Sequence, residues 1–310
     1  MNLQNIFSEI ENVDAEVYDR MDTRRSAMKQ FANFTGKAAL AAMPLALGSM
    51  FKKAYGQTPN DVLDVLQFAL TLEYLEASFY TQGVASPAVA GNAAVSPAAL
   101  GALQKIRDHE NAHVQYLRAV ITSTGNTPVS FTNANFDFTG GATTVSPNIG
   151  NGPFKGWNAD YDIFLAVSQT LEDTGVRAYK GQAGRLINNK PVLTAALNIH
   201  SVEARHASHI RQMRRARALV SGAFTAAYVG NIKPWIEQKQ SNIGGNNPVP
   251  GAGNASFAAA VQGNYDGEET TNQLGVNILS INGDINAATA SFDEPLTKAQ
   301  VLNLIDGFVI

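Results

Sequence analysis

A glutamate followed three residues later by a histidine occurs twice in this chain, and this repeated pair constrains the fold more than any other feature. The two copies are Glu110-Asn-Ala-His113 and Glu203-Ala-Arg-His206. Residues three apart share one face of an α-helix, so both side chains of a copy can reach the same point beside the helix. A buried glutamate is costly unless it is paired or bound to a metal ion. The pattern therefore favours a fold that brings both helix faces together around metal ions.

Each copy is preceded by one further glutamate on another segment of the chain. Glu73 precedes the first copy and Glu172 precedes the second. Seven residues after each of these glutamates stands a tyrosine, Tyr80 and Tyr179, which is two helical turns on and therefore on the same face. The chain thus repeats one unit, a helix hairpin that supplies a glutamate and then a glutamate–histidine pair.

Four long segments have the apolar periodicity of α-helices. Short connections join the first to the second and the third to the fourth, so each pair is expected to form an antiparallel hairpin. The connection between the pairs, residues 125–158, is long enough to cross from one end of a bundle to the other, and strand-like pairing within it is an open alternative. The sequence predicts an all-α, up-down four-helix bundle. Its helices are expected at residues 59–83, 96–123, 159–187 and 190–220.

The repeated unit predicts a site for two metal ions between the hairpins. Four buried carboxylates would repel one another, and two divalent cations would balance their charge. The chain has no cysteine, so thiolate sites, iron–sulfur clusters, disulfides and cysteine nucleophiles are excluded. Carboxylates and imidazoles suit iron, manganese or zinc. The predicted ligands are Glu73, Glu110, His113, Glu172, Glu203 and His206.

Several side chains near these positions have more than one interpretation. Glu76 lies one turn from Glu73 and is either a further ligand or a group behind the ligands. Its counterpart in the second hairpin is Gly175, so the symmetry of the repeat favours Glu73. Tyr80 and Tyr179 are either core tyrosines with bonded hydroxyl groups or catalytic redox groups. The sequence further assigns His109, His200 and His209 to surface or supporting positions, and Arg211, Arg214, Arg215 and Arg217 to a solvent-exposed helix face.

The first helical segment resembles the ferritin-like superfamily. Residues 69–80, Ala-Leu-Thr-Leu-Glu-Tyr-Leu-Glu-Ala-Ser-Phe-Tyr, are similar to the first helix of bacterial, often exported, ferritin-like domain proteins related to plant desiccation-related proteins. Tyr228-Val-Gly and Lys233-Pro-Trp are also similar, so the resemblance covers residues 60–235 and fits the tail poorly. It implies a ferritin-like bundle with a non-haem di-iron or di-manganese site. Members of the family range from ferroxidases to peroxide-consuming enzymes and proteins of unknown role.

Three functions are open on this basis. The leading expectation is a redox-active protein with two iron ions that react with dioxygen or peroxide in stress protection. A dimanganese catalase would use the same ligand types. A structural or stress-protective assembly protein is the third, because no catalytic role needs the long tail. Iron storage in a ferritin cage is disfavoured, since the long crossover and the tail do not suit compact symmetric contacts.

The N-terminal part resembles a twin-arginine export signal. Arg24-Arg25 precedes a weakly apolar run at residues 36–48, and the small residues Ala54 and Gly56 follow. The run is too short and too rich in alanine for a stable membrane span. We therefore expect export to the periplasm or the extracellular space, with a cytoplasmic location as the alternative.

Composition and organisation complete the sequence-based expectations. A net charge of −3 implies no basic surface for nucleic acid. Residues 1–57 are expected to be a leader, 58–221 the bundle, and 222–310 an irregular extension with short helices at 255–262 and within 296–310. Asp293-Glu294-Pro295 is expected to cap the last helix. The extension could pack on the bundle, cover a mouth of it, or mediate assembly into a homo-oligomer.

Overall fold

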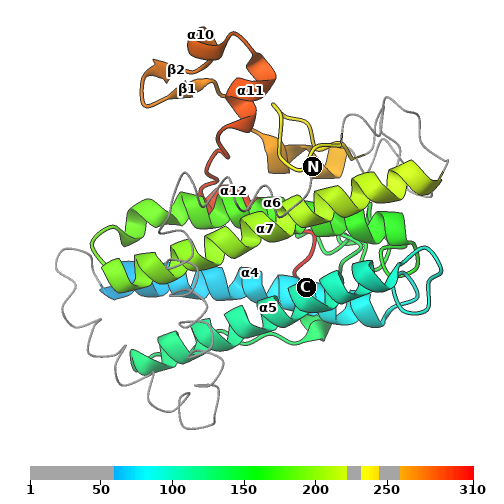
Figure 1. Ribbon diagram of the computed structural model, residues 1–310. Helices are drawn as coiled ribbons and strands as arrows, with labels where there is room; N and C mark the ends of the chain where they lie inside the picture. The colour runs from blue at the N-terminus through cyan, green and yellow to red at the C-terminus, as the bar shows by residue number, and fades with distance from the viewer. Residues whose placement is uncertain (1–58, 222–231, 244–258) are drawn as a thin grey trace, which may run out of the picture. The chain divides into compact units, whose positions relative to one another are not determined.

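The computed structural model describes residues 59–221, 232–243 and 259–310 (Figure 1). All of them belong to one compact unit, Ala54–Ile310. The twin-arginine pattern, the expected leader and its boundary at residue 57 lie outside the described residues. Among the described helices, none combines the length and the apolarity that a membrane crossing requires.

Four long helices form two antiparallel hairpins, which confirms the predicted helical bundle (Figure 1). The Ser96 hydroxyl accepts a hydrogen bond from the N–H of Ala99, so the second helix begins where the sequence places it. The Asp160 carboxylate caps the third helix in the same way. That helix changes to a 3₁₀ turn, η2 (Gly184–Leu186), before the predicted end. The helices are α4 (Pro59–Ala85), α5 (Pro97–Ser123), α6 (Tyr161–Ala183) and α7 (Lys190–Ser221).

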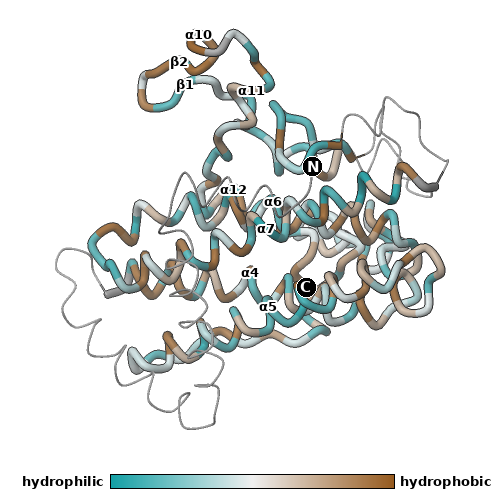
Figure 2. The backbone as a smooth tube through the Cα atoms, viewed as in Figure 1, coloured by the Kyte–Doolittle hydropathy of each residue, from teal (hydrophilic) through white to brown (hydrophobic). Residues whose placement is uncertain are grey.

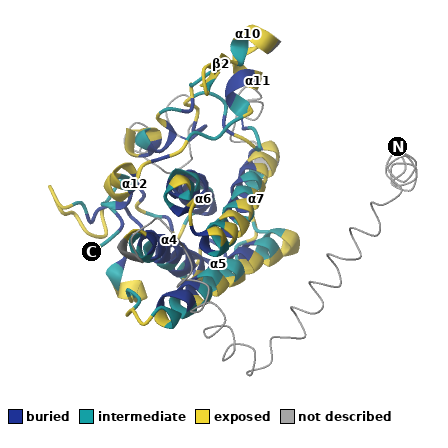
Figure 3. Ribbon diagram, turned by 90° about the vertical axis from the view of Figure 1, so that its left-hand side faces the viewer, coloured by how far each residue is buried: buried dark blue, intermediate teal, exposed yellow. Residues whose placement is uncertain are grey.

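The helix α6 is buried on every side. Every residue from 163 to 179 is buried, and α6 contacts α4, α7 and the tail (Figure 3). Phe79 of α4 stacks on Phe164 of α6 with ring centroids 5.0 Å apart. Gly83 permits this approach, because a Cβ there would lie 2.2 Å from the Phe164 ring. The hydrophobic core is therefore centred on the α4–α6 contact.

The crossover between the hairpins contains one 3₁₀ turn, η1 (Asn133–Asn135), and otherwise irregular backbone. In the described residues it forms no strand pair with itself. Instead, Phe136 forms an isolated antiparallel bridge with Val309, and the Asp137 N–H donates to the Phe308 carbonyl at 2.8 Å. The C-terminal residues thus take the backbone partners that pairing within the crossover would need.

The tail contains short elements that pack on one another and on the bundle. Its last helix, α12, is predicted, but its cap is not at residues 293–295. Thr297 caps it, since the Thr297 hydroxyl accepts from the Gln300 N–H while the Gln300 side chain accepts from the Thr297 N–H. The elements are η3 (Gly263–Tyr265), the hairpin of β1 (Asn272–Gln273) and β2 (Val276–Asn277), α10 (Leu279–Asn282), α11 (Ile285–Ala290) and α12 (Lys298–Ile305).

Hydropathy alternates along the four long helices, as it does on amphipathic helices (Figure 2). The hairpin and α10 also carry exposed apolar side chains, those of Leu274, Val276 and Ile281. Leu274 and Ile281 are mostly exposed, and Val276 is about half exposed.

Two of the four arginines near the end of α7 do not lie on the predicted solvent-exposed face, whereas Arg215 is exposed as predicted and Arg217 is half-buried. Arg211 is 1% exposed and Arg214 is 5% exposed. The Arg211 Nε donates to Asp173 Oδ1 of α6 at 3.1 Å, and the Arg214 Nη2 donates to the Asn242 carbonyl at 2.7 Å. The prediction was wrong for Arg211 and Arg214 because it treated α7 as an outer helix, whereas the tail covers this side of the α6–α7 pair.

Candidate metal centre

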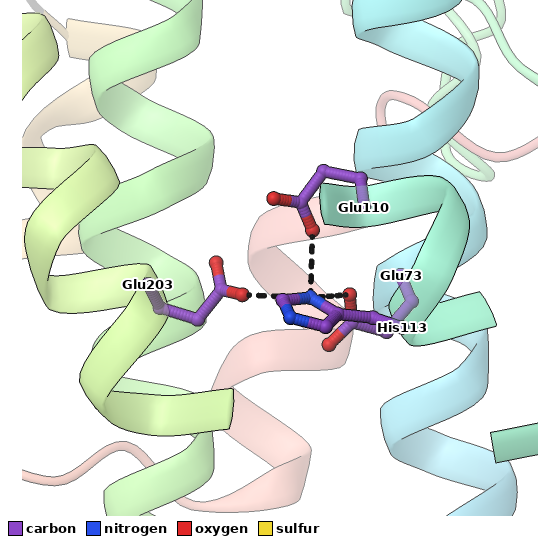
Figure 4. Close-up of side chains that lie close together, drawn as sticks. All are labelled: Glu73, Glu110, His113 and Glu203. Atoms are coloured by element: carbon purple, nitrogen blue, oxygen red, sulfur yellow. Dashed lines mark hydrogen bonds and ion pairs between the residues drawn. The ribbon is translucent and has the colours of Figure 1, made fainter. Parts of the chain in front are cut away.

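The bundle brings all six predicted ligand residues together in its interior. Each helix contributes part of the cluster, with the histidines and their glutamates on α5 and α7. One group of side chains whose ligand atoms lie within 4.8 Å of one another is Glu73, Glu110, His113 and Glu203 (Figure 4). The second such group is Glu110, Glu172, Glu203 and His206.

Glu110 and Glu203 belong to both groups, and each group has its own histidine. The Nδ1 of His113 lies 3.0 Å from Glu73 Oε2, 3.2 Å from Glu110 Oε2 and 3.3 Å from Glu203 Oε1. The Nδ1 of His206 lies 2.8 Å from Glu110 Oε1. Both rings therefore point the same nitrogen at the carboxylates. The two groups could hold two ions, and Glu110 and Glu203 would be available to both of them.

The two tyrosines cross between the hairpins. The Tyr80 hydroxyl of α4 donates to Glu172 Oε1 of α6 at 2.5 Å. The Tyr179 hydroxyl of α6 donates to Glu73 Oε1 of α4. Each tyrosine thus holds the glutamate of the other hairpin, and the repeat seen in the sequence becomes a two-fold arrangement in space. A redox role for the tyrosines stays a prediction.

The cluster contains buried polar atoms that have no hydrogen-bond partner among the described residues. The four glutamates are 0% exposed. Glu110 Oε1 and His206 Nδ1 are only 2.8 Å apart, but they lack the angles of a hydrogen bond. Buried groups left in this way are rare, and metal coordination would satisfy them. The atoms are Oε1 of Glu110, Oε2 of Glu172, both carboxylate oxygens of Glu203 and Nδ1 of His206.

Burial and the neighbouring groups shift the pKa values of the cluster in both directions. Burial raises the pKa of Glu73 to about 7, although His113 opposes this effect. Burial acts in the same direction on Glu110, but the hydrogen bonds of the two histidines outweigh it and lower the pKa of Glu110 to about 2. Burial acts to lower the pKa of His206, but Glu172 and Glu110 raise it to about 11. Ion binding must therefore displace protons.

A family model described as a ferritin-like domain matches residues 61–216, which contain the whole cluster. The chain belongs to the ferritin-like family. This confirms the family and the bundle that the sequence predicts, while the narrower likeness to bacterial and desiccation-related members stays a prediction. Neither the curated proteins nor the solved structures contain a match to the chain.

The ferritin-like domain holds a fifth buried glutamate at the cluster. Glu76 is 3% exposed, and its pKa is raised well above the ordinary value by burial and by Glu203. A Cβ at Gly175 would lie 3.1 Å from Glu76 Oε1 and 3.4 Å from Glu203 Oε2. Gly175 therefore leaves the space that the Glu76 carboxylate occupies. In the sequence, Gly175 disfavours Glu76 as a ligand because it breaks the symmetry of the repeat. In the structure, the missing side chain of Gly175 makes room for the Glu76 carboxylate.

One of the histidines that the sequence assigns to surface or supporting positions lies directly beside the cluster. His109 Nδ1 lies 3.0 Å from His206 Nε2, and the two rings are nearly parallel with centroids 5.2 Å apart. His200 instead contacts the Val176 carbonyl, away from the cluster. The position of His109, directly before Glu110, turns it about 100° from the ligand face toward α7. Only the packing of α5 on α7 reveals that contact.

Proposed function

We propose that this ferritin-like domain binds two redox-active metal ions, iron in the first place and manganese as the alternative. The observation that carries the proposal is the convergence of unpartnered buried atoms from Glu110, Glu172, Glu203 and His206 on two overlapping groups of side chains. An apolar core would satisfy none of these atoms, whereas divalent cations would satisfy them and neutralise the carboxylates.

The residues divide into three roles in this proposal. Glu110 and Glu203, which both groups share, would help to hold both ions. Glu73 and Glu172 would each bind one ion and are oriented by the tyrosine of the opposite hairpin. His113 and His206 would each give one nitrogen to one ion. The carboxylate and imidazole set suits iron and manganese and does not separate them.

Two such ions supply electron-transfer chemistry with dioxygen or peroxide when bound. The protein excludes water from the carboxylates, all of which are fully buried. The His113 side chain keeps 13% of its surface exposed, so small oxidants would reach the cluster on its side. Ferroxidase or peroxide chemistry in stress protection is the activity that we propose. Dimanganese catalase activity is the alternative with the same residues.

Metal analysis of the full-length protein from its native host tests the proposal. We expect about two iron or manganese ions per chain and oxidation of anaerobically bound ferrous iron when peroxide is added. The double variant Glu110→Ala, Glu203→Ala should lose both ions. The matched control Glu269→Ala, which changes an exposed glutamate of the tail, should keep them. A wild-type protein that folds and takes up no metal would reject the proposal.

An assembly role of the tail is a second candidate function, favoured by the exposed side chains of Leu274, Val276 and Ile281. Contiguous exposed apolar patches mark interaction sites, and we propose that these three side chains form one. Replacing Leu274 with aspartate should lower the oligomeric state in light scattering if the tail assembles copies of the chain. An unchanged monomeric mass in both proteins would reject it.

Export by the twin-arginine route also remains part of our proposal. It rests on the order of residues 24–56 alone, since they lie outside the described part of the chain. Fractionation of cells that express wild-type protein and the Arg24→Lys, Arg25→Lys variant tests it. We expect only the wild type outside the cytoplasm.

A further inference from the structure

The ring of His206 is held at both of its nitrogens. Its Nδ1 faces the carboxylates, 2.8 Å from Glu110 Oε1 and 3.4 Å from Glu172 Oε2. Its Nε2 lies 3.0 Å from Nδ1 of His109. A histidine that binds a metal through Nδ1 carries its proton on Nε2. The Nε2–H of His206 would then donate to the unprotonated Nδ1 of His109.

The other histidine of the cluster has no equivalent histidine support among the described residues. His113 also points Nδ1 at the carboxylates, and the two hairpins repeat one arrangement. His109 directly precedes Glu110, and the residue that directly precedes Glu203 is Val202. A valine side chain cannot accept a hydrogen bond from an imidazole. The two hairpins therefore differ at this position, and the difference gives a hydrogen-bond partner to His206 and not to His113.

We propose that His109 is a positioning residue that fixes the ring orientation and the tautomer of His206. This makes the ion position of Glu172 and His206 the tighter of the two, and the position of Glu73 and His113 the weaker. The inference rests on the proposed function, since it requires that the cluster binds two ions. His109 acts through His206, because its near nitrogen faces the Nε2 of that ring and not the carboxylates.

The expected size of the effect follows from other metal sites. Loss of the hydrogen-bond partner of a metal-binding histidine typically costs about 10–100-fold in metal affinity. Only one of the two ions should lose this factor, since His109 contacts only one of the two histidines. The metal affinities of the two ion positions, which are unequal in the wild type, should therefore become more nearly equal when His109 is removed.

Titration of the metal-free, full-length protein with cobalt(II) tests the inference, since bound cobalt(II) reports each site by its visible absorption. The wild type should show two steps of unequal affinity. In His109→Ala the tighter step should weaken about 10–100-fold and its absorption should shift, while the weaker step stays unchanged. His109→Gln should restore most of the affinity, because its carbonyl oxygen can accept the same hydrogen bond.

His200→Ala is the matched control, since His200 is also half-buried and its ring contacts a backbone carbonyl away from the cluster. It should titrate like the wild type. Thermal unfolding of the metal-free variants checks that each is folded, and His109→Leu, which also lacks a hydrogen-bond acceptor, carries the test if His109→Ala is not. Unchanged steps in His109→Ala, equal weakening of both steps, or failure of glutamine to restore the affinity would each overturn the inference. A wild type that binds no cobalt would overturn the proposed function as well.

Discussion

At the scale of single residues, the cluster is built from two half-sites that depend on each other. Tyr80 donates to the glutamate of the second hairpin and Tyr179 to that of the first. The first hairpin therefore needs the second to orient Glu73, and the second needs the first to orient Glu172. This interdependence explains why each tyrosine lies two turns after its glutamate. At that distance it reaches past its own glutamate to the one across the interface.

Replacing Tyr80 with phenylalanine tests this dependence. We expect the metal affinity of one ion to fall about 10-fold or more, because the Glu172 carboxylate loses its only hydroxyl donor among the described residues. Tyr179→Phe should lower the affinity for the ion held by Glu73 by a similar factor. Competition with a chelator measures the two affinities. Tyr161→Phe, which changes another buried tyrosine of α6, should have no effect, and an equal loss in that control would contradict the assignment.

Metal binding should strengthen as the pH rises. Without an ion, the pKa of Glu73 is raised to about 7 and that of His206 to about 11, so both groups carry protons below pH 7. Binding needs the ionised carboxylate and the neutral imidazole, and it must release these protons. The apparent affinity should therefore increase between pH 6 and pH 8. Calorimetry in buffers with different ionisation enthalpies counts the protons, and a binding enthalpy independent of the buffer would contradict the prediction.

The sequence predicts the ligand positions well because their spacing on helices is fixed by helix geometry. The three-residue and seven-residue intervals define faces before any packing is known. It leaves the roles of His109 and Glu76 open between two alternatives, since these roles depend on a neighbouring helix. His109 needs the approach of α7, and Glu76 needs the absence of a side chain at Gly175.

At the scale of elements, α6 shows where reasoning from amphipathicity stops. The face opposite Glu172 carries polar residues such as Thr174 and Arg177, which is the pattern of a solvent-exposed face. Both are buried, because the tail covers them. The Arg177 Nε lies 2.7 Å from Glu268 Oε1 of the tail. Polar residues on a helix can lie either on a solvent-exposed face or in a hydrogen-bonded interface within the chain. A single sequence does not distinguish these two arrangements.

The two helical glycines Gly101 and Gly175 should respond differently to alanine. Nothing lies within 4 Å of a Cβ at Gly101, so Gly101→Ala should raise the free energy of unfolding by about 0.5–1 kcal/mol. At Gly175 the new methyl group would press on the Glu76 carboxylate at 3.1 Å. We expect a smaller gain in stability and weaker metal binding. Urea unfolding and metal titration measure the two effects, and equal behaviour of both variants would contradict the role of Gly175.

At the scale of the whole molecule, the tail is part of the fold. The Leu296 N–H donates to the Arg177 carbonyl at 3.1 Å, and the C-terminal residues bond to the crossover. The four helices and their connections follow from local patterns, which the sequence displays. The docking of the tail depends on contacts between residues far apart in the chain, so the sequence left three roles open for it. The structure shows that it packs on α6.

Gly181 of α6 is the position where this docking can be broken without touching the cluster. A Cβ there would lie 1.9 Å from the Leu296 carbonyl oxygen, so the tail backbone must move away from the helix. Gly181→Ala should lower the free energy of unfolding by about 1–3 kcal/mol through overpacking. It should also make residues 259–310 more sensitive to limited proteolysis.

The metal content of Gly181→Ala should stay at the wild-type level, since Gly181 lies about 180° around α6 from Glu172. Gly184→Ala is the matched control, because nothing lies within 4 Å of a Cβ at Gly184, which directly follows α6. Its proteolysis should match that of the wild type. If Gly181→Ala loses its metal while the tail stays protected from cleavage, the substitution affects the cluster and not the docking of the tail. That result would contradict the prediction, which places the two on opposite faces of α6. An unchanged cleavage pattern in both variants would show that the tail does not depend on its close approach to Gly181.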